Sequence, residues 1–383
     1  MARTSYSQSS TFMRCGKHWE WKYKEKMEPL MEGSSLYFGT AVDQAVMEML
    51  EGKDNFLTVF SDRWYSTEKK KGKEKFYYQI YDSPDIIYSY NDFDEHVLSD
   101  EDIGSMQSWL DELKIGTGKD PIDYMKEVSG KKKSKYKSPT ANELRYFNRV
   151  SWLSLKRKGE LLISHFHKEF YPYVTKTVST QQFATIKDSA TGDMIMGALD
   201  FVATLNIKTL RDKGHDIPED IPDEATVIVD LKTASRRYTT ENIDLSEQLP
   251  LYLALSKGQY NTDLVGYAVL IKNLSKDSEA FCKDCGNKKS GRHKTCDAVV
   301  NKIRCGGEWV GATKVKPQLQ VIIRRKNEDD MNKVLLDQGM VLAAMRNGII
   351  WRNLDACSNW YGAKCPFYDA CHNGSLNGLR RKY

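Results

Sequence analysis

The stretch ATVIVDLK at residues 225–232 decides how this chain can fold. Residues 227–229 are a continuous β-branched run, which is typical of a central strand covered on both faces. Asp230 and Lys232 follow at its end, and residues two apart in a strand point to the same side. A carboxylate and an ammonium at the end of an apolar strand are costly to bury without partners. The stretch therefore predicts a central strand that brings two charged groups to one place.

The segments around this strand predict a sheet with helices beside it. Strands are expected over residues 182–187, 194–205, 264–271 and 318–324, and helices over residues 37–50, 243–256 and 328–346. Residues 188–193 are typical of a hairpin turn in which Gly192 takes a positive φ, and residues 208–223 of a polar loop. The expected fold class is α/β (α+β), a central mixed sheet flanked by helices.

The composition is that of a globular protein. Of the 383 residues, 40% are hydrophobic and 28% are charged, which excludes bulk disorder. The net charge of +5 is mild and indicates no partner by itself. No stretch approaches the ~20 apolar residues of a membrane span, and residues 1–23 lack the apolar segment of a secretory signal. We therefore expect a cytoplasmic protein with no membrane partner.

Charge and cysteine patterns divide the chain into five parts. Lysine runs at residues 69–71 and 131–133 lie among aromatic residues, and apolar residues there recur at helical spacing. Lysines that follow phosphates and rings that stack on bases suit single-stranded DNA, whereas a solvated helical surface is the alternative. The parts are an N-terminal helical part with Cys15 (1–60), a charged helical insertion (61–175), the core sheet (176–275), a cysteine insertion (276–312), and the last strand, helix and tail (313–383).

A second aspartate precedes the central strand by one predicted hairpin strand. Asp200 follows the segment GAL at residues 197–199 and, together with Asp230, can complete a site for Mg²⁺ or Mn²⁺. Lys232 beside such an ion can orient or deprotonate a water, while the ion neutralises charge developing on a phosphodiester. The alternative is a plain salt bridge at a strand end.

Two predicted helices add polar groups. Asp43 shares a helix face with apolar residues, so it either binds a metal or lies at the helix edge facing water. Gln248 and Tyr252 are four residues apart on a helix that is apolar nearly all round. Gln248 can hydrogen-bond a substrate phosphate or a metal-bound water, or it can satisfy a loop carbonyl.

Four of the eight cysteines lie in one short stretch, in the order Cys282, Cys285, Cys296 and Cys305. The first two are separated by two residues, and Gly286 and Gly306 provide tight turns after ligands. This spacing predicts a closed tetrahedral zinc site, which is structural or helps to grip DNA. His293 is an alternative ligand, and four unrelated thiols are the alternative to a metal site.

The order of these motifs resembles the PD-(D/E)XK nuclease superfamily. The similarity is greatest to its RecB-type branch, which includes the CRISPR-adaptation exonucleases and phage recombination exonucleases. The matching motifs are Gly39-x-x-x-Asp43, Gly197-x-x-Asp200, Asp230-Leu231-Lys232-Thr233 and Gln248-x-x-x-Tyr252. The resemblance implies a restriction-endonuclease-like fold. It also implies Mg²⁺ or Mn²⁺ ligands at Asp43, Asp200, Asp230 and the Leu231 carbonyl, and catalytic roles for Asp200, Asp230, Lys232, Gln248 and Tyr252.

Two positions depart from the family pattern. The family usually has His at the position of Asp43, which changes the expected metal preference. It often has Glu just before the hairpin strand, where this chain has Gln181 and Gln182.

The other four cysteines also fit the resemblance. RecB-type nucleases with an iron–sulfur cluster take one ligand before the nuclease core and three after it, which here implies Cys15, Cys357, Cys365 and Cys371. The spacing from Cys357 to Cys365 is longer than usual. A [4Fe–4S] cluster on these thiolates would join the two chain ends. Zinc at the same cysteines, or a set of buried structural thiols, is the alternative.

The sequence therefore predicts a metal-dependent DNA exonuclease that acts in replication, repair or recombination, in the host cytoplasm if the chain is phage-encoded. Its partner is DNA with a free end and single-stranded character, and a second copy or a recombination partner protein is left open. One alternative is an inactive DNA-binding recombination or scaffold protein on a nuclease-like fold. The other is a structure-specific endonuclease, which would cut circular DNA.

Overall fold

The structure is a computed structural model that describes most of the chain outside the centre of the predicted insertion. The described residues are 3–29, 31–65, 67–70, 73–79, 86–89, 141–278, 280–288, 294–300, 303–310, 313–358 and 364–382. The lysine run at 131–133 and His293 lie outside them.

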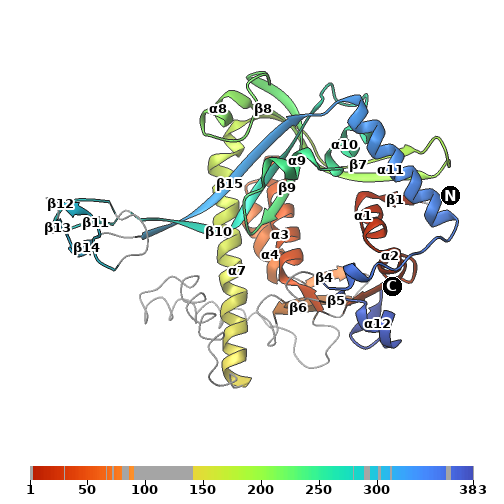
Figure 1. Cartoon of the computed structure of the whole chain (residues 1–383), viewed down its shortest axis with the longest axis horizontal. Helices are drawn as coiled ribbons and strands as arrows, with labels where there is room; N and C mark the ends of the chain where they lie inside the picture. The colour runs from red at the N-terminus through yellow and green to blue at the C-terminus, as the bar shows by residue number, and fades with distance from the viewer. Residues whose placement is uncertain are drawn as a thin grey trace.

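Within the described residues, the core is a six-stranded mixed sheet (Figure 1). The strands follow the order β1 (Arg3–Ser5), β8 (Met194–Asn206), β9 (Glu224–Ala234), β10 (Leu264–Ser278) and β15 (Thr313–Arg325), and β7 (Val174–Lys187) also pairs with β8. β9 and β10 are parallel, whereas β7–β8, β8–β9 and β10–β15 are antiparallel. The predicted mixed sheet is confirmed.

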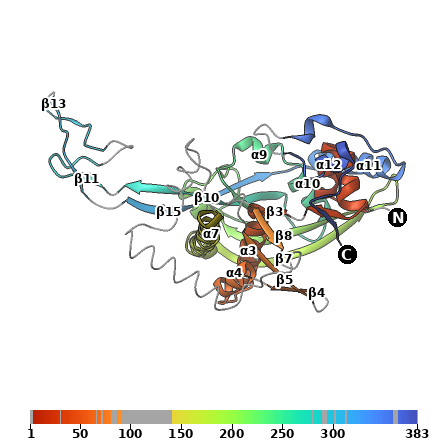
Figure 2. The same cartoon turned by 90° about the horizontal axis from the view of Figure 1, so that it is seen from below.

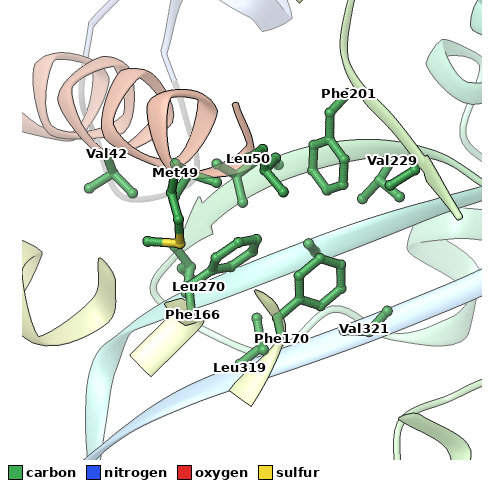
Figure 3. Packing of buried hydrophobic residues seen from close by; sticks show 14 of the residues in the cluster. Val42, Met49, Leu50, Phe166, Phe170, Phe201, Val229, Leu270, Leu319 and Val321 are labelled. Carbon is green, nitrogen blue, oxygen red and sulfur yellow. The ribbon is translucent and has the colours of Figure 1, made fainter. Parts of the chain in front are cut away.

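Helices cover both faces of this sheet. One face packs against α3 (Ser34–Leu50), α4 (Phe56–Tyr65) and α7 (Ala141–Glu169), and the other against α9 (Thr240–Asp244), α10 (Gln248–Leu255) and α11 (Glu328–Arg346). Figure 3 shows the first face, where Met49 of α3 and Phe166 and Phe170 of α7 lie over Phe201 and Val229 of the sheet. Removing these apolar surfaces from water holds the three layers together.

The predicted hairpin, central strand and last helix are all present, and Gly192 in the hairpin turn has φ 72°. The helix predicted over residues 243–256 is instead two helices, α9 and α10. Pro250 explains the break, because its ring and missing N–H prevent a helix from continuing through the preceding turn, whereas proline is tolerated in the first turn of α10.

One further prediction is wrong. The polar loop expected at residues 208–223 contains α8 (Ile207–Asp212), because Asn206 caps the Thr209 N–H at 3.0 Å and two apolar side chains are buried. The described part of the charged insertion is helical in α7 but also contains strands. β4 (Thr67–Lys70), β5 (Lys73–Gln79) and β6 (Ile86–Ser89) form a small sheet with β3 (Met31–Gly33), and the aromatic run in β5 favours a strand.

β10 and β15 continue beyond the core as a two-stranded arm (Figures 1 and 2). Their pairing runs from Leu264↔Arg325 to Ser278↔Thr313, with a register shift after Ile271. The cysteine insertion lies at the tip of the arm, where β11 (Phe281–Cys282) pairs with β14 (Trp309–Val310), and β12 (Val299–Val300) with β13 (Ile303–Arg304).

The two ends of the chain meet. β2 (Met27–Pro29) pairs with β16 (Leu379–Arg381), and α1 (Tyr6–Arg14) and α2 (Gly16–Trp19) lie near α12 (Tyr368–Asn373) (Figure 1). A Cβ at Gly16 would lie 2.9 Å from the Trp351 backbone nitrogen, so the close approach requires glycine there. In the described part of the chain, no helix is long and apolar enough to cross a membrane.

Candidate active site and metal centres

The two predicted site aspartates of the sheet lie where β9 separates from β8. The β8–β9 pairing begins at Asn206↔Glu224 and ends at Phe201↔Val229, while β9 continues beside β10 as far as Ala234. Nearer the start of β8, at residues 194–196, the same edge of β8 pairs with β1. Asp200 and Asp230 are the first residues beyond the last β8–β9 pair. We call this interruption of the sheet the fork.

Asp200 takes the place of a strand partner at the fork. Its Oδ2 accepts a hydrogen bond from the Leu231 N–H at 2.8 Å, which satisfies a backbone donor that β8 no longer pairs. Burial raises the pKa of Asp200 to about 8, and the neighbouring carboxylates of Asp230 and Asp43 add to this rise. Asp200 is therefore an acid whose ionised form is disfavoured by burial and by the neighbouring acids.

Asp230 and Lys232 share one side of β9, as predicted, and form an ion pair with 2.7 Å between Nζ and Oδ2. Asp230 is 1% exposed, and burial raises its pKa even though the Lys232 ammonium opposes this shift. Burial lowers the pKa of Lys232, but the attraction of Asp230 outweighs it and the net pKa is raised. Lys232 is therefore an ammonium at neutral pH.

α10 supplies a polar pair that joins this ion pair. The Lys232 Nζ donates to Gln248 Oε1 at 3.2 Å, and Gln248 Nε2 donates to the Tyr252 hydroxyl at 2.6 Å. Tyr252 in turn hydrogen-bonds Asp230. Gly197 lets α10 lie close to β8, since a Cβ there would be 2.5 Å from Leu255 Cδ1. Gln248 thus contacts the site and not a loop carbonyl.

Asp43 approaches the fork from the other helical layer. Burial raises its pKa to about 6, a hydrogen bond from Gln181 Nε2 at 3.0 Å opposes the rise, and the charge of Asp230 adds to it. Gly39, one turn earlier in α3, allows this helix to approach β9, because a Cβ there would lie 3.2 Å from Thr233 Oγ1. Asp43 is not an acid that simply faces water at a helix edge.

The structure distinguishes the two glutamines that stand where the resemblance expects Glu. Gln181 lies between the β7–β8 pairs Thr180↔Phe201 and Gln182↔Leu199, which places it opposite Asp200. Its φ of 43° lies in a region that non-glycine residues rarely adopt. Gln182 instead binds Gln259 and Tyr260, away from the fork.

The donor set suits a hard divalent cation. Three acidic side chains from three elements converge, and the Asp230 Oδ2 atom is buried with the Lys232 ammonium as its ion-pair partner. In the part of the chain that the structure describes, only a cysteine set brings three or more candidate ligands within 4.8 Å of one another, so the carboxylates are more widely spaced. Mg²⁺ is often held by one or two carboxylates together with waters and substrate phosphate, which this spacing allows.

The cysteines at the tip of the arm form a compact set, and the four of them could hold a metal. Their sulfur atoms all lie within 4.8 Å of one another, with 3.5 Å between Cys282 and Cys305 and 3.6 Å between Cys285 and Cys296. Burial raises the pKa of the Cys282 thiol, whereas the backbone N–H groups of Cys285 and Asp284 and the other thiols lower it, to about 7 overall. The thiolate, which is the metal-binding form, is thereby favoured at Cys282, whereas burial raises the pKa of Cys296 to about 12.

The backbone around these thiols is shaped for a bound ion. Gly286 and Gly306 have φ of 71° and 67°, as predicted for the two turns. A Cβ at Gly307 would lie 2.6 Å from the Cys282 sulfur, so this position must be glycine for the sulfurs to meet.

The second cysteine set lines one pocket between the chain ends, formed in part by Cys15, Cys357, Cys365 and Cys371. Burial raises the pKa of Cys365, and the other three thiols add to this rise, so all four lie near one another. Trp21 Nε1 donates to the Cys371 sulfur at 3.2 Å. These four sulfurs are gathered less tightly than those of the arm, because they do not all lie within 4.8 Å of one another.

Lys232 is surrounded by tyrosines that the sequence patterns did not identify. Tyr267 pairs with Asp230 in the β9–β10 register, and its ring centroid lies 5.9 Å from the Lys232 Nζ. Tyr238 packs edge-to-face on Tyr267 with centroids 5.4 Å apart, and burial raises the pKa of Tyr6 nearby. If the pairing register of β9 and β10 is known, Tyr267 can be found as the residue opposite Asp230. No sequence pattern points to Tyr6 or Tyr238.

No known protein-family model matches the chain, and no curated protein matches its sequence.

Proposed function

We propose that this protein is a metal-dependent deoxyribonuclease that hydrolyses phosphodiester bonds from DNA ends. The observation that supports it most is the convergence of Asp200, Asp230 and Lys232 at the fork, with Asp43 beside them. A salt bridge accounts for the Asp230–Lys232 pair alone. It does not account for two further carboxylates with raised pKa values, because burying like charges together is destabilising until a cation neutralises them.

In this proposal Asp200 and Asp230, with Asp43 and the Leu231 carbonyl, hold Mg²⁺ or Mn²⁺. The ion, when bound, polarises the phosphodiester and lowers the pKa of a water. Lys232 keeps its proton, so its ammonium orients the water or binds a phosphate oxygen while negative charge develops. Gln248 fixes the position of the Lys232 Nζ, and Tyr252 fixes Asp230. The restriction-endonuclease-like fold of the PD-(D/E)XK superfamily belongs to the same proposal, because the residues that carry the resemblance meet at one place.

The cysteine sets are assigned to two different groups. Zinc fits the arm, where four thiolates at about 2.3 Å from one ion would be in mutual contact. A [4Fe–4S] cluster is assigned to Cys15, Cys357, Cys365 and Cys371, because these four thiols line one pocket between the two chain ends, which the cluster would join. Both groups are structural in this proposal.

The test is digestion of end-labelled linear DNA, single- and double-stranded, beside circular DNA of the same sequence. Wild type is compared with Lys232→Ala and with the control Lys257→Ala, which removes an exposed lysine paired with Glu328. With Mg²⁺ or Mn²⁺ we expect degradation of linear DNA only, reduced roughly 100-fold or more in Lys232→Ala, the lower range for loss of a proton-transferring or charge-stabilising side chain.

Two other outcomes would change the assignment. Cleavage of the circular DNA would make the protein an endonuclease. No cleavage by a folded, metal-loaded wild type would overturn the proposed hydrolysis and favour an inactive DNA-binding protein.

A further inference from the structure

Residues 235–239 (SRRYT) form a loop that leaves β9 three residues after Lys232 and leads into α9. We call it the arginine–tyrosine loop. Arg236 and Arg237 are both exposed, and among the described residues neither has a carboxylate within ion-pair distance. Two unpaired guanidinium groups on a loop that begins three residues after Lys232 favour an anionic ligand, since guanidinium groups match phosphate geometry.

A side-chain amide from the edge of the sheet fixes this loop. Gln320 Oε1 accepts the Tyr238 N–H at 2.8 Å, and Gln320 Nε2 donates to the Tyr238 carbonyl at 2.9 Å. Val269 pairs with both Lys232 and Gln320, so these two residues lie in one row across the sheet, roughly 10 Å apart and on the same face. The double hydrogen bond therefore holds Tyr238 at a set place beside Lys232.

The ring of Tyr238 completes an aromatic surface next to the charged pair. It packs edge-to-face on Tyr267, at an interplanar angle of 80°, and Tyr267 faces the Lys232 Nζ. Tyr238 is only partly buried, so part of its surface is open to a ligand. An aromatic ring on the same loop as unpaired cations is the combination that binds single-stranded nucleic acid, in which bases stack on rings and phosphates meet positive charges.

We propose that the arginine–tyrosine loop grips a single DNA strand beside the bond to be cleaved, with Arg236 and Arg237 on phosphates and Tyr238 on an unpaired base. Gln320 is a positioning residue that holds Tyr238. The substrate class is single-stranded DNA, because the face of a base is free for stacking only when the base leaves the duplex. This inference rests on the proposed nuclease function and deepens it.

The test measures binding of a labelled 12-nucleotide oligo-dT by fluorescence anisotropy, with full-length protein and no added Mg²⁺ or Mn²⁺. We expect Tyr238→Ala to weaken binding roughly 5- to 150-fold, the range found for loss of one stacked base, and Tyr238→Phe to bind within about twofold of wild type. Arg236→Ala and Arg237→Ala should each lower the slope of log K against log salt by about 0.7. The control Arg157→Ala removes an exposed arginine from α7, on the opposite face of the sheet.

Wild-type binding by folded Tyr238→Ala and by both loop arginine variants would overturn the inference. If Tyr238→Ala does not fold, the two arginine variants decide it. Binding and cleavage separate this inference from the proposed function. If wild type cleaves no DNA but the loop variants bind oligo-dT more weakly than wild type, only the proposed hydrolysis is refuted. If wild type cleaves DNA and the loop variants bind normally, only the assignment of the loop is refuted.

Discussion

His215 links the pH dependence of stability to the edge of the central sheet. The loop after α8 covers the outer edge of β15, where Asp216 exchanges backbone hydrogen bonds with Val321 and Ile323 at 3.1 Å each. His215 Nδ1 accepts the Val321 N–H at 3.3 Å. A ring nitrogen can accept only while it is unprotonated, so protonation at this atom removes the bond.

The environment of His215 disfavours its charged form. Its pKa is lowered from 6.5 to about 4, chiefly by burial; the charges of Lys213, Arg237 and His165 contribute to this lowering, and Glu169 opposes it. Below pH 6.5 the unfolded chain binds a proton that the folded protein does not bind until about pH 4, so stability is lost as pH falls through this window. From these two pKa values, the free energy of unfolding falls by about 2 kcal/mol at pH 5 and by only about 0.2 kcal/mol at pH 7.

The assay is urea unfolding of wild type and His215→Asn at pH 7 and pH 5. The asparagine amide oxygen can accept the same N–H but does not titrate, and comparison at equal pH cancels the other titrating groups and the metal sites. We expect the variant to gain about 2 kcal/mol relative to wild type between pH 7 and pH 5. An equal loss of stability in both proteins would refute the assignment of the acid sensitivity to His215.

Three further predictions concern the arm, the helical layer and the chain ends. Gly307→Ala should weaken zinc binding by pressing on the Cys282 sulfur, measured by competition with a chelator; unchanged affinity would contradict the close approach. Gly159→Ala should lower the free energy of unfolding by about 1–3 kcal/mol, because its Cβ would overlap the ring of buried Phe60, and Phe60→Leu should relieve part of this loss. Anaerobically purified protein should absorb broadly at roughly 400 nm and Cys15→Ser should lose this absorbance, whereas colourless wild type with two zinc ions per chain would exclude the cluster.

Sequence patterns predicted the parts of this fold in which burial is visible locally. The β-branched run at residues 227–229 forms a central strand that is buried on both faces. A strand with one face in water would alternate apolar and polar residues, and this run does not. Two features that were not predicted also have local signals in the sequence. Pro250 marks the start of α10, and the aromatic run in β5 favours a strand. Local sequence patterns thus predict whether a segment is a helix or a strand. Errors arise where one segment carries signals for both a continuing element and a break or another element type.

The contacts that complete the site join residues that are distant in sequence, and local patterns do not report them. Gln181 and Gln182 are chemically identical, and only the β7–β8 register and a positive φ decide which one reaches Asp43. Gln320 and Tyr238 are 82 residues apart and meet because β15 lies two strands from β9. Such contacts depend on strand order, which the sequence of either segment does not contain.

The fork explains why carboxylates from different layers can meet at all. An intact sheet would keep α3 and α10 on opposite sides, each about 10 Å from the sheet. It would also occupy the Leu231 N–H with a backbone carbonyl and leave Asp200 without this partner. Because β9 leaves β8 after Val229, Asp200 can take that N–H. Asp43 can also approach closely enough for the charge of Asp230 to raise its pKa, and both charges raise the pKa of Asp200. The interruption gives up strand pairing and gathers repulsion, both of which are destabilising in the protein alone, and the cation that we propose for this site would relieve the repulsion.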